Sequence, residues 1–258
     1  MITPTDLSPN FSANFSPELY KRVFEQLHGF GECTFDNKEN YPLEYQDFPV
    51  NADTIPVLLA LVDDLDRPPV DESLAKLPEA VWVPIHAARV LSTHQVPEAI
   101  DTIIATFFTH NHDDWVNETF PEMLCLYGEK IVQDLLDELM QEDQIWYSDV
   151  CGYASILRTL ELLATNHPAV LSDVCQSLRH KLEEYRFLPP SFTSFIIHTL
   201  VTLKDSASVE LIQEIFACDF LDLEILNWKF VHTAFPLIAE LPEIINPNYK
   251  LAWAEKYL

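Results

Sequence analysis

The densest cluster of side chains that could hold a metal ion lies at residues 110–114, which read His-Asn-His-Asp-Asp. Imidazoles and carboxylates are ligands that zinc accepts, usually four around one ion. Neighbouring residues of one loop rarely converge on an ion without distant partner ligands, and the spacing offers none. Asn and Asp are also preferred at the start of a helix, where their oxygens accept hydrogen bonds from exposed N–H groups. We therefore predict a helix-capping loop, with no metal ligand assigned, and a metal site is the alternative.

The other nucleophiles and bases predict no catalytic site. Histidines occur singly on or beside predicted helices, where such a residue is more often packed or solvated than catalytic. No Ser-His-Asp or Cys-His arrangement follows from the spacing. The chain contains neither a G-x-G-x-x-G nor a Walker-type phosphate loop, so we expect no nucleotide-binding architecture. We predict no cofactor and favour a non-enzymatic protein over an enzyme.

Acidic residues recur at a fixed phase, counted from four leucines at intervals of 35, 37 and 40 residues. These leucines are Leu91, Leu126, Leu163 and Leu203. An acid stands ten or eleven residues after each of them, and the four acids are Asp101, Asp137, Asp173 and Glu214. A neighbouring row, seven or eight residues after three of the leucines, consists of Glu98, Asp134 and Glu210.

If the helices that carry these seven acids stack side by side, the carboxylates form one negative surface. Such a surface attracts a basic protein or peptide and raises its association rate. The alternative is that the polar helix faces of so acidic a chain carry acids everywhere.

Five aromatic residues near predicted helix boundaries form a second candidate interface. Amphipathic aromatic side chains are favoured in protein interfaces, but large aromatic residues are equally expected in the core of loosely similar repeats. The five are Trp115, Trp146, Tyr147, Trp228 and Phe230.

Composition limits the partners that the chain can bind. It has 258 residues, with 15 Lys and Arg against 41 Asp and Glu, and thus a net charge of −26. Binding to nucleic acid or to an anionic membrane depends on Lys and Arg, so we expect neither. The N-terminus lacks the basic start and apolar stretch of a secretory signal. The five cysteines are odd in number and form no C-x-x-C pair, which suits a reducing cytoplasm.

The hydrophobic period predicts the elements that position these residues. Apolar residues step at helical intervals from Val81 to Leu91 and again from Val96 to Phe107, and three similar pairs follow. A period of two never persists, so the chain is predicted to be all-α. Paired helices of similar layout are typical of a repeat array, in which Leu126 and Leu163 would be buried between stacked pairs.

The stretches Val83–Ile100 and Trp115–Leu136 resemble HEAT-like repeats of the short bacterial type. The matching elements are the Ala-Ala-Arg-Val-Leu run at residues 87–91, the turn after it, and Glu-Ala-Ile or Lys-Ile-Val at the start of a second helix. The resemblance covers about residues 81–218 and implies an α-α superhelix of the armadillo or HEAT type. Repeats of this class also occur in lyases that attach bilins to light-harvesting proteins.

We expect one solenoid domain, residues 1–258, of four to six helical pairs. Residues 1–80 would form atypical N-terminal helices, the first with Ser16 as N-cap and Pro17 at its first position, and the loops Gly31–Val50 and Asp66–Pro69. Residues 81–218 would form the repeats, and residues 219–258 a C-terminal cap with a helix pattern over Asp222–Leu241. The function we predict is that of a protein-interaction scaffold with an acidic concave surface. The alternative is a bilin-lyase-like enzyme or chaperone that handles a tetrapyrrole or a basic protein; homo-oligomerisation is a further option.

Overall fold

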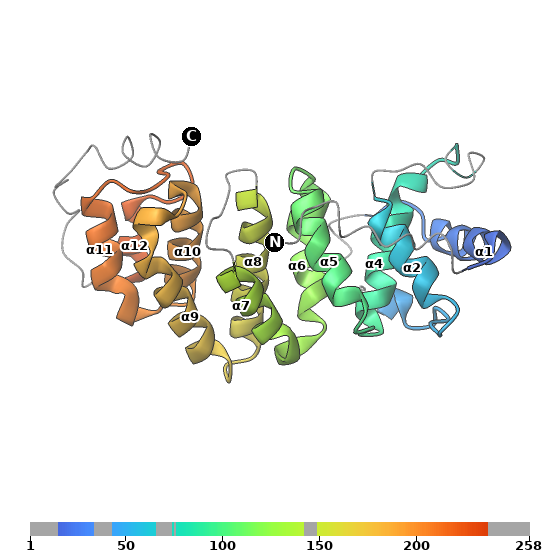
Figure 1. The fold of residues 1–258 in the computed structure, drawn as a ribbon, viewed down its shortest axis with the longest axis horizontal. Coiled ribbons are helices and arrows are strands. Elements are labelled where there is room, and N and C mark those ends of the chain that lie inside the picture. The colour runs from blue at the N-terminus through green and yellow to red at the C-terminus, as the bar shows by residue number, and fades with distance from the viewer. Residues whose placement is uncertain (1–14, 34–42, 66–73, 75, 142–148, 237–258) are drawn as a thin grey trace. The chain divides into compact units, whose positions relative to one another are not determined.

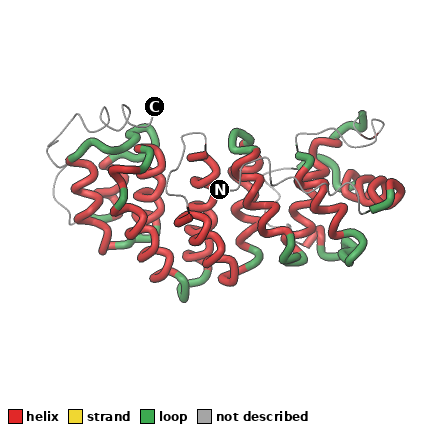
Figure 2. The backbone as a smooth tube through the Cα atoms, in the orientation of Figure 1, coloured by secondary structure: helices red, strands yellow, loops and turns green. Residues whose placement is uncertain are grey.

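The structure is a computed structural model that describes residues 15–33, 43–65, 74, 76–141 and 149–236. Within these ranges the chain forms eleven α-helices and no strand, which confirms the all-α prediction (Figures 1 and 2). None of the described helices is long and apolar enough to cross a membrane.

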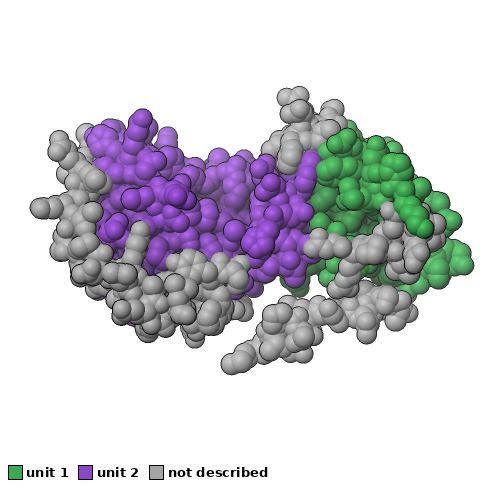
Figure 3. Space-filling model, turned by 90° about the horizontal axis from the view of Figure 1, so that it is seen from above, with its two compact units in different colours: residues 1–106 green, residues 107–258 purple. Residues whose placement is uncertain are grey.

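The chain forms two compact units, residues 1–106 and residues 107–258 (Figure 3). The first unit contains α1 (Pro17–His28), α2 (Ile55–Asp63), α4 (Val83–Thr93) and most of α5 (Ala99–Thr109). The second contains α6 (Asp114–Cys125), α7 (Val132–Gln141), α8 (Val150–Asn166), α9 (Leu171–Glu183), α10 (Pro190–Thr202), α11 (Val209–Ala217) and α12 (Trp228–Ala234). The boundary between the units lies inside α5 and coincides with neither predicted boundary, and the single-domain organisation stays a prediction.

In the first unit, α4 packs against both α1 and α2. Residues 83–92 of α4 are all buried, and so are residues 57–62 of α2. A helix that is buried on every side belongs to the centre of a core. The helix α1 begins at Pro17, as predicted, and Ser16 is its N-cap: the Ser16 hydroxyl accepts a hydrogen bond from the Leu19 N–H at 3.1 Å.

In the second unit, α8 lies between α6 and α10 (Figure 1) and also packs against α7 and α9. The helix α7 contacts α9, and α10 contacts α9 and α12. Gly152 of α8 faces the end of α5, where an added Cβ would lie 2.8 Å from the main-chain oxygen of Phe107.

Of the two leucines predicted to be buried between stacked pairs, Leu163 is buried and Leu126 is not. Leu91 and Leu163 are fully buried. Leu126 and Leu203 are half-buried, because they are the C-cap residues of α6 and α10 and lie at the edge of the packed layer. The spacing of the four leucines therefore does not mark one equivalent core position.

The C-terminal helix begins later than predicted. Asp222 lies in a turn, where its N–H donates to the Ser194 hydroxyl at 2.8 Å, and α12 begins only at Trp228. The side chain of Asn227 caps α12 by accepting from the Phe230 N–H at 3.1 Å. The helix ends at Ala234, since Pro236 disfavours helical geometry in the residue before it. Residues 237–241 of the predicted helix lie outside the described residues.

The long predicted loop Gly31–Val50 contains the short 3-10 helix η3 (Leu43–Tyr45). Residues 34–42 of this loop, and the whole of the second predicted loop, Asp66–Pro69, lie outside the described residues.

Three helices end in the same turn, in which a residue other than glycine adopts positive φ. After α10, the Asp205 N–H donates to the Leu200 carbonyl and the Lys204 N–H to the Val201 carbonyl, while Lys204 has a φ of 57°. These two bonds define a Schellman motif, whose left-handed position usually holds glycine. The turns after α4 and α11 repeat the pattern, with Gln95 and Asp219 in the left-handed position.

Replacing Lys204 by glycine is expected to raise the free energy of unfolding by about 0.5–1 kcal/mol, because glycine adopts positive φ without the steric cost of a Cβ. Chemical denaturation followed by circular dichroism measures the change. Gln176→Gly is the control: the residue is exposed inside α9, so the same replacement should lower stability by about 1 kcal/mol. A loss of stability in Lys204→Gly would contradict the assignment of the turn.

Candidate functional site

The His-Asn-His-Asp-Asp cluster caps a helix. Asp113 is the N-cap residue of α6, and its Oδ1 accepts from the N–H groups of Trp115 at 2.7 Å and Val116 at 3.3 Å. The carbonyl of Asn111 accepts from the Asn117 side chain at 2.8 Å. The capping prediction is confirmed. Over the described ranges, no three His, Cys, Asp or Glu side chains are grouped so that they could hold a metal ion.

All seven acids of the two rows are exposed on the surface. In the first unit they are Glu98, which precedes α5, and Asp101 on α5. In the second unit they are Asp134 and Asp137 on α7, Asp173 on α9, and Glu210 and Glu214 on α11. On α7 the opposite face is buried and apolar, with Val132, Leu135, Leu136 and Leu139. The acids therefore lie on the solvent-facing side of these helices.

These helices carry few compensating positive charges. No Lys or Arg occurs in α5, α7 or α11. The two in α9 are both held by ion pairs within the chain: Arg179 pairs with Asp205, and Lys181, itself buried, pairs with Glu184 at 3.2 Å. The exposed charge contributed by α7 and α11 is thus entirely negative.

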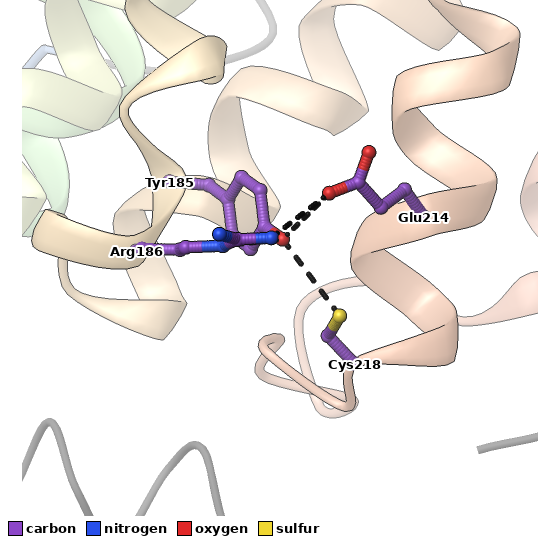
Figure 4. A network of polar contacts seen from close by, with 4 residues as sticks. All are labelled: Tyr185, Arg186, Glu214 and Cys218. Atoms are coloured by element: carbon purple, nitrogen blue, oxygen red, sulfur yellow. Dashed lines mark hydrogen bonds and ion pairs between the residues drawn. The ribbon is translucent and has the colours of Figure 1, made fainter. Parts of the chain in front are cut away.

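Glu214 differs from the other acids because it is bound to the turn that follows α9 (Figure 4). Its Oε1 accepts from the Tyr185 hydroxyl at 3.0 Å and pairs with the Arg186 guanidinium at 3.2 Å. Arg186 Nε also donates to the Tyr185 oxygen at 3.0 Å, and the thiol of Cys218 lies 3.7 Å from that oxygen. Burial raises the pKa of Tyr185, so the hydroxyl keeps the proton that it donates to Glu214.

This network makes Glu214 a link between η7 (Tyr185–Phe187) and α11, with part of its charge compensated by Arg186. Neither partner is recognisable from the sequence pattern, since Tyr185 and Arg186 lie in a short 3-10 turn between two periodic segments. Over the described residues of the second unit, no Lys or Arg pairs with the other acids of the rows, Asp134, Asp137, Asp173 and Glu210. Asp137 accepts a hydrogen bond from the Gln133 side-chain amide at 2.7 Å.

Two of the five candidate interface aromatics contribute to internal packing. Trp228 meets Phe216 of α11 edge to face, with ring centroids 4.9 Å apart. Phe230 stacks on His198 of α10 at 4.7 Å and nearly parallel. Both contacts attach α12 to its neighbours. Trp115 is half-buried, and Trp146 and Tyr147 lie outside the described residues.

The structure brings together a cysteine and a histidine that are 53 residues apart and that no sequence motif connects. In the first unit, the thiol of Cys33 lies 3.6 Å from Nε2 and 3.7 Å from Nδ1 of His86. Nε2 of His86 contacts the Gly31 carbonyl at 2.8 Å, and Nδ1 contacts the Tyr45 hydroxyl at 2.7 Å. Arg89 Nη1 donates to the Tyr45 oxygen at 3.3 Å. We call these four side chains, Cys33, Tyr45, His86 and Arg89, the His86 cluster.

The His86 cluster is not suited to nucleophilic catalysis. A reactive cysteine needs a thiolate, stabilised by a nearby positive charge such as an imidazolium or a guanidinium. Arg89 acts in that direction on Cys33, but burial is the larger cause. Burial instead raises the pKa of Cys33 to about 11 and lowers that of His86 to about 4, so both side chains stay neutral near pH 7. The sulfur is almost equidistant from the two ring nitrogens and in line with neither, and both nitrogens already have oxygen partners.

Comparisons of the chain with protein-family models, with curated proteins and with solved structures found no match. The resemblance to HEAT-like repeats therefore stays a prediction that rests on the residues quoted for it.

Proposed function

We propose that this protein is a non-enzymatic interaction scaffold that binds a basic protein or peptide through the acidic faces of α5, α7, α9 and α11, the second helix of each predicted pair. The observation that supports this most is the distribution of charge. All seven acids of the rows are exposed, and three of the four helices that carry them contain no Lys or Arg.

The packing of the second unit supports a repeat array as the framework. Successive first helices α6, α8 and α10 contact one another in chain order, and the second helices α7 and α9 do the same. Stacked helical pairs of this kind build the extended concave surfaces that repeat proteins use for binding. We propose a HEAT-like solenoid in which α6–α7, α8–α9 and α10–α11 are consecutive pairs and the acids of α7, α9 and α11 follow one another along one surface.

A cationic partner would relieve the mutual repulsion of these acids and form favourable charge pairs with them. Electrostatic complementarity of this kind acts mainly on the association rate and on specificity. The interaction should weaken with salt, because exposed charges are screened over about 8 Å at physiological ionic strength.

The triple variant Asp134→Asn, Asp137→Asn and Asp173→Asn tests the proposal. At low salt it should bind a lysine-rich peptide about tenfold more weakly than the wild type, and the difference should shrink at 0.5 M salt. Affinity is measured by fluorescence anisotropy. Glu214 is left unchanged, since its removal would also disturb the network with Tyr185 and Arg186.

A matched control separates the surface from the overall charge. Glu118→Gln, Glu129→Gln and Glu224→Gln remove the same number of negative charges from exposed positions outside the rows. An equal loss of affinity in the two triple variants would contradict the proposal, since binding would then follow net charge alone. The bilin-lyase alternative predicts instead that the protein shifts the absorbance of an added tetrapyrrole.

A further inference from the structure

We propose that His86 is an acid-sensitive latch: in its neutral form it fastens residues 29–33 and η3 to α4, and its protonation releases them. The proposal is independent of the proposed function. It rests on the hydrogen bonds of the His86 cluster and on the charged groups around the ring.

The partners of the ring determine where its proton lies. The Gly31 carbonyl can only accept a hydrogen bond, so Nε2 of His86 carries the proton and donates it. Nδ1 is then bare and accepts from the Tyr45 hydroxyl, whose oxygen accepts in turn from Arg89. The donors run in one direction, from Arg89 through Tyr45 and His86 to Gly31, and only neutral imidazole fits that order.

The ring joins three parts of the chain that are distant in sequence. Gly31 and Cys33 belong to the segment after α1, Tyr45 belongs to η3, and His86 lies in the middle of α4. Phe30 covers both rings, with centroids 5.4 Å from His86 and 4.7 Å from Tyr45. His86, Tyr45 and Cys33 are each no more than 2% exposed, so water cannot replace these contacts while the segment stays in place.

A second proton on His86 would disturb this arrangement in two ways. The new N–H on Nδ1 would point at the Tyr45 hydroxyl, which could no longer donate to that nitrogen. The imidazolium would also be buried close to the guanidinium of Arg89, a like charge. Release of the segment would return the ring to water, where both nitrogens can donate.

The surrounding groups determine the direction of the effect. Arg89 on α4 and His28 on α1 both disfavour a positive ring, and the buried residues of α2, which packs against α4, are all apolar. Glu79, which precedes η4 (Ala80–Trp82), lies near Gly31, with its carboxylate 3.5 Å from where a Cβ on Gly31 would be. Of the nearby carboxylates, Glu44 raises the pKa of both Cys33 and Tyr45, the neighbours of the ring, and Glu32 raises the pKa of Cys33. Burial is the largest cause and lowers the pKa of His86 from its ordinary 6.5 to about 4. Between these values the released state binds more protons than the fastened state, so falling pH favours release.

Hydrogen exchange tests the latch in the whole chain. From pH 7.5 to pH 5.0, above the isoelectric point of about 4.4, the opening equilibrium should rise about 30-fold. The reporters are the N–H groups of Gly31, which bonds the His28 carbonyl, and Phe48, which bonds the Tyr45 carbonyl. Their protection factors, corrected for the intrinsic exchange rate, should fall by that factor. Amides inside α8 should change far less.

Two variants complete the test. His86→Gln keeps one donor and one acceptor but cannot titrate, so the pH dependence of the reporters should disappear. His94→Gln is the matched control: His94 contacts the Tyr45 carbonyl at 3.0 Å, and the variant should keep the pH dependence. Protection that is unchanged at pH 5.0, or that is lost equally in His86→Gln, would overturn the proposal. So would a wild-type His86 ring that titrates near pH 6.5 by NMR, a measurement that needs no variant.

Discussion

Replacing Leu163 by alanine is expected to lower the free energy of unfolding by about 2–5 kcal/mol. The side chain is fully buried in α8, the helix that packs against α6, α7, α9 and α10. Its truncation removes apolar contacts and leaves a cavity that the surrounding helices can fill only in part. Urea denaturation, monitored by far-ultraviolet circular dichroism, gives the difference.

Leu126→Ala is the control for this prediction. Leu126 is half-buried at the C-cap of α6, so a smaller loss is expected. If Leu126→Ala costs as much as Leu163→Ala, the packing described for the two positions is wrong.

The variant Gly152→Ala is also expected to destabilise the protein, by about 1–3 kcal/mol, although alanine is the better helix former. The new Cβ would lie 2.7 Å from Cδ1 of Phe108 and 2.8 Å from the main-chain oxygen of Phe107. The phenyl ring can turn aside, but the carbonyl moves only if α8 or the end of α5 moves with it.

Thermal unfolding distinguishes this steric effect from helix propensity. Cys151→Ala, at the exposed neighbouring position, should change stability little. Propensity alone would make Gly152→Ala more stable by about 1 kcal/mol. That result would contradict the close packing of α8 against Phe107 and Phe108, which belong to the second unit.

The helices could be predicted from sequence because their buried faces repeat at a helical interval. The apolar steps from Val81 to Leu91 predict α4, and Ser16 with Pro17 predicts the start of α1. The turns could not be predicted in the same way. Left-handed positions are usually recognised by glycine, but the chain has only four glycines, and Gln95, Lys204 and Asp219 occupy three of these positions.

The exposure of the seven acids was also predictable, because residues out of phase with the apolar face point to solvent. The contacts that Glu214 and Cys33 make with distant residues were not predictable. Glu214 is 28 residues from Arg186, and Cys33 is 53 residues from His86, and both contacts depend on how separate elements pack. Local periodicity contains no information about such contacts.

The most direct test of the scaffold proposal is to locate the bound peptide on the protein. Addition of a lysine-rich peptide to isotope-labelled protein at low salt should produce saturable amide shifts that are largest near Asp134 and Asp137 on α7 and Asp173 on α9. Buried positions of α8 and α10 should shift little, and 0.5 M salt should reverse the effect. Shifts spread evenly over all acidic positions, or the absence of saturable shifts at low salt, would contradict the account.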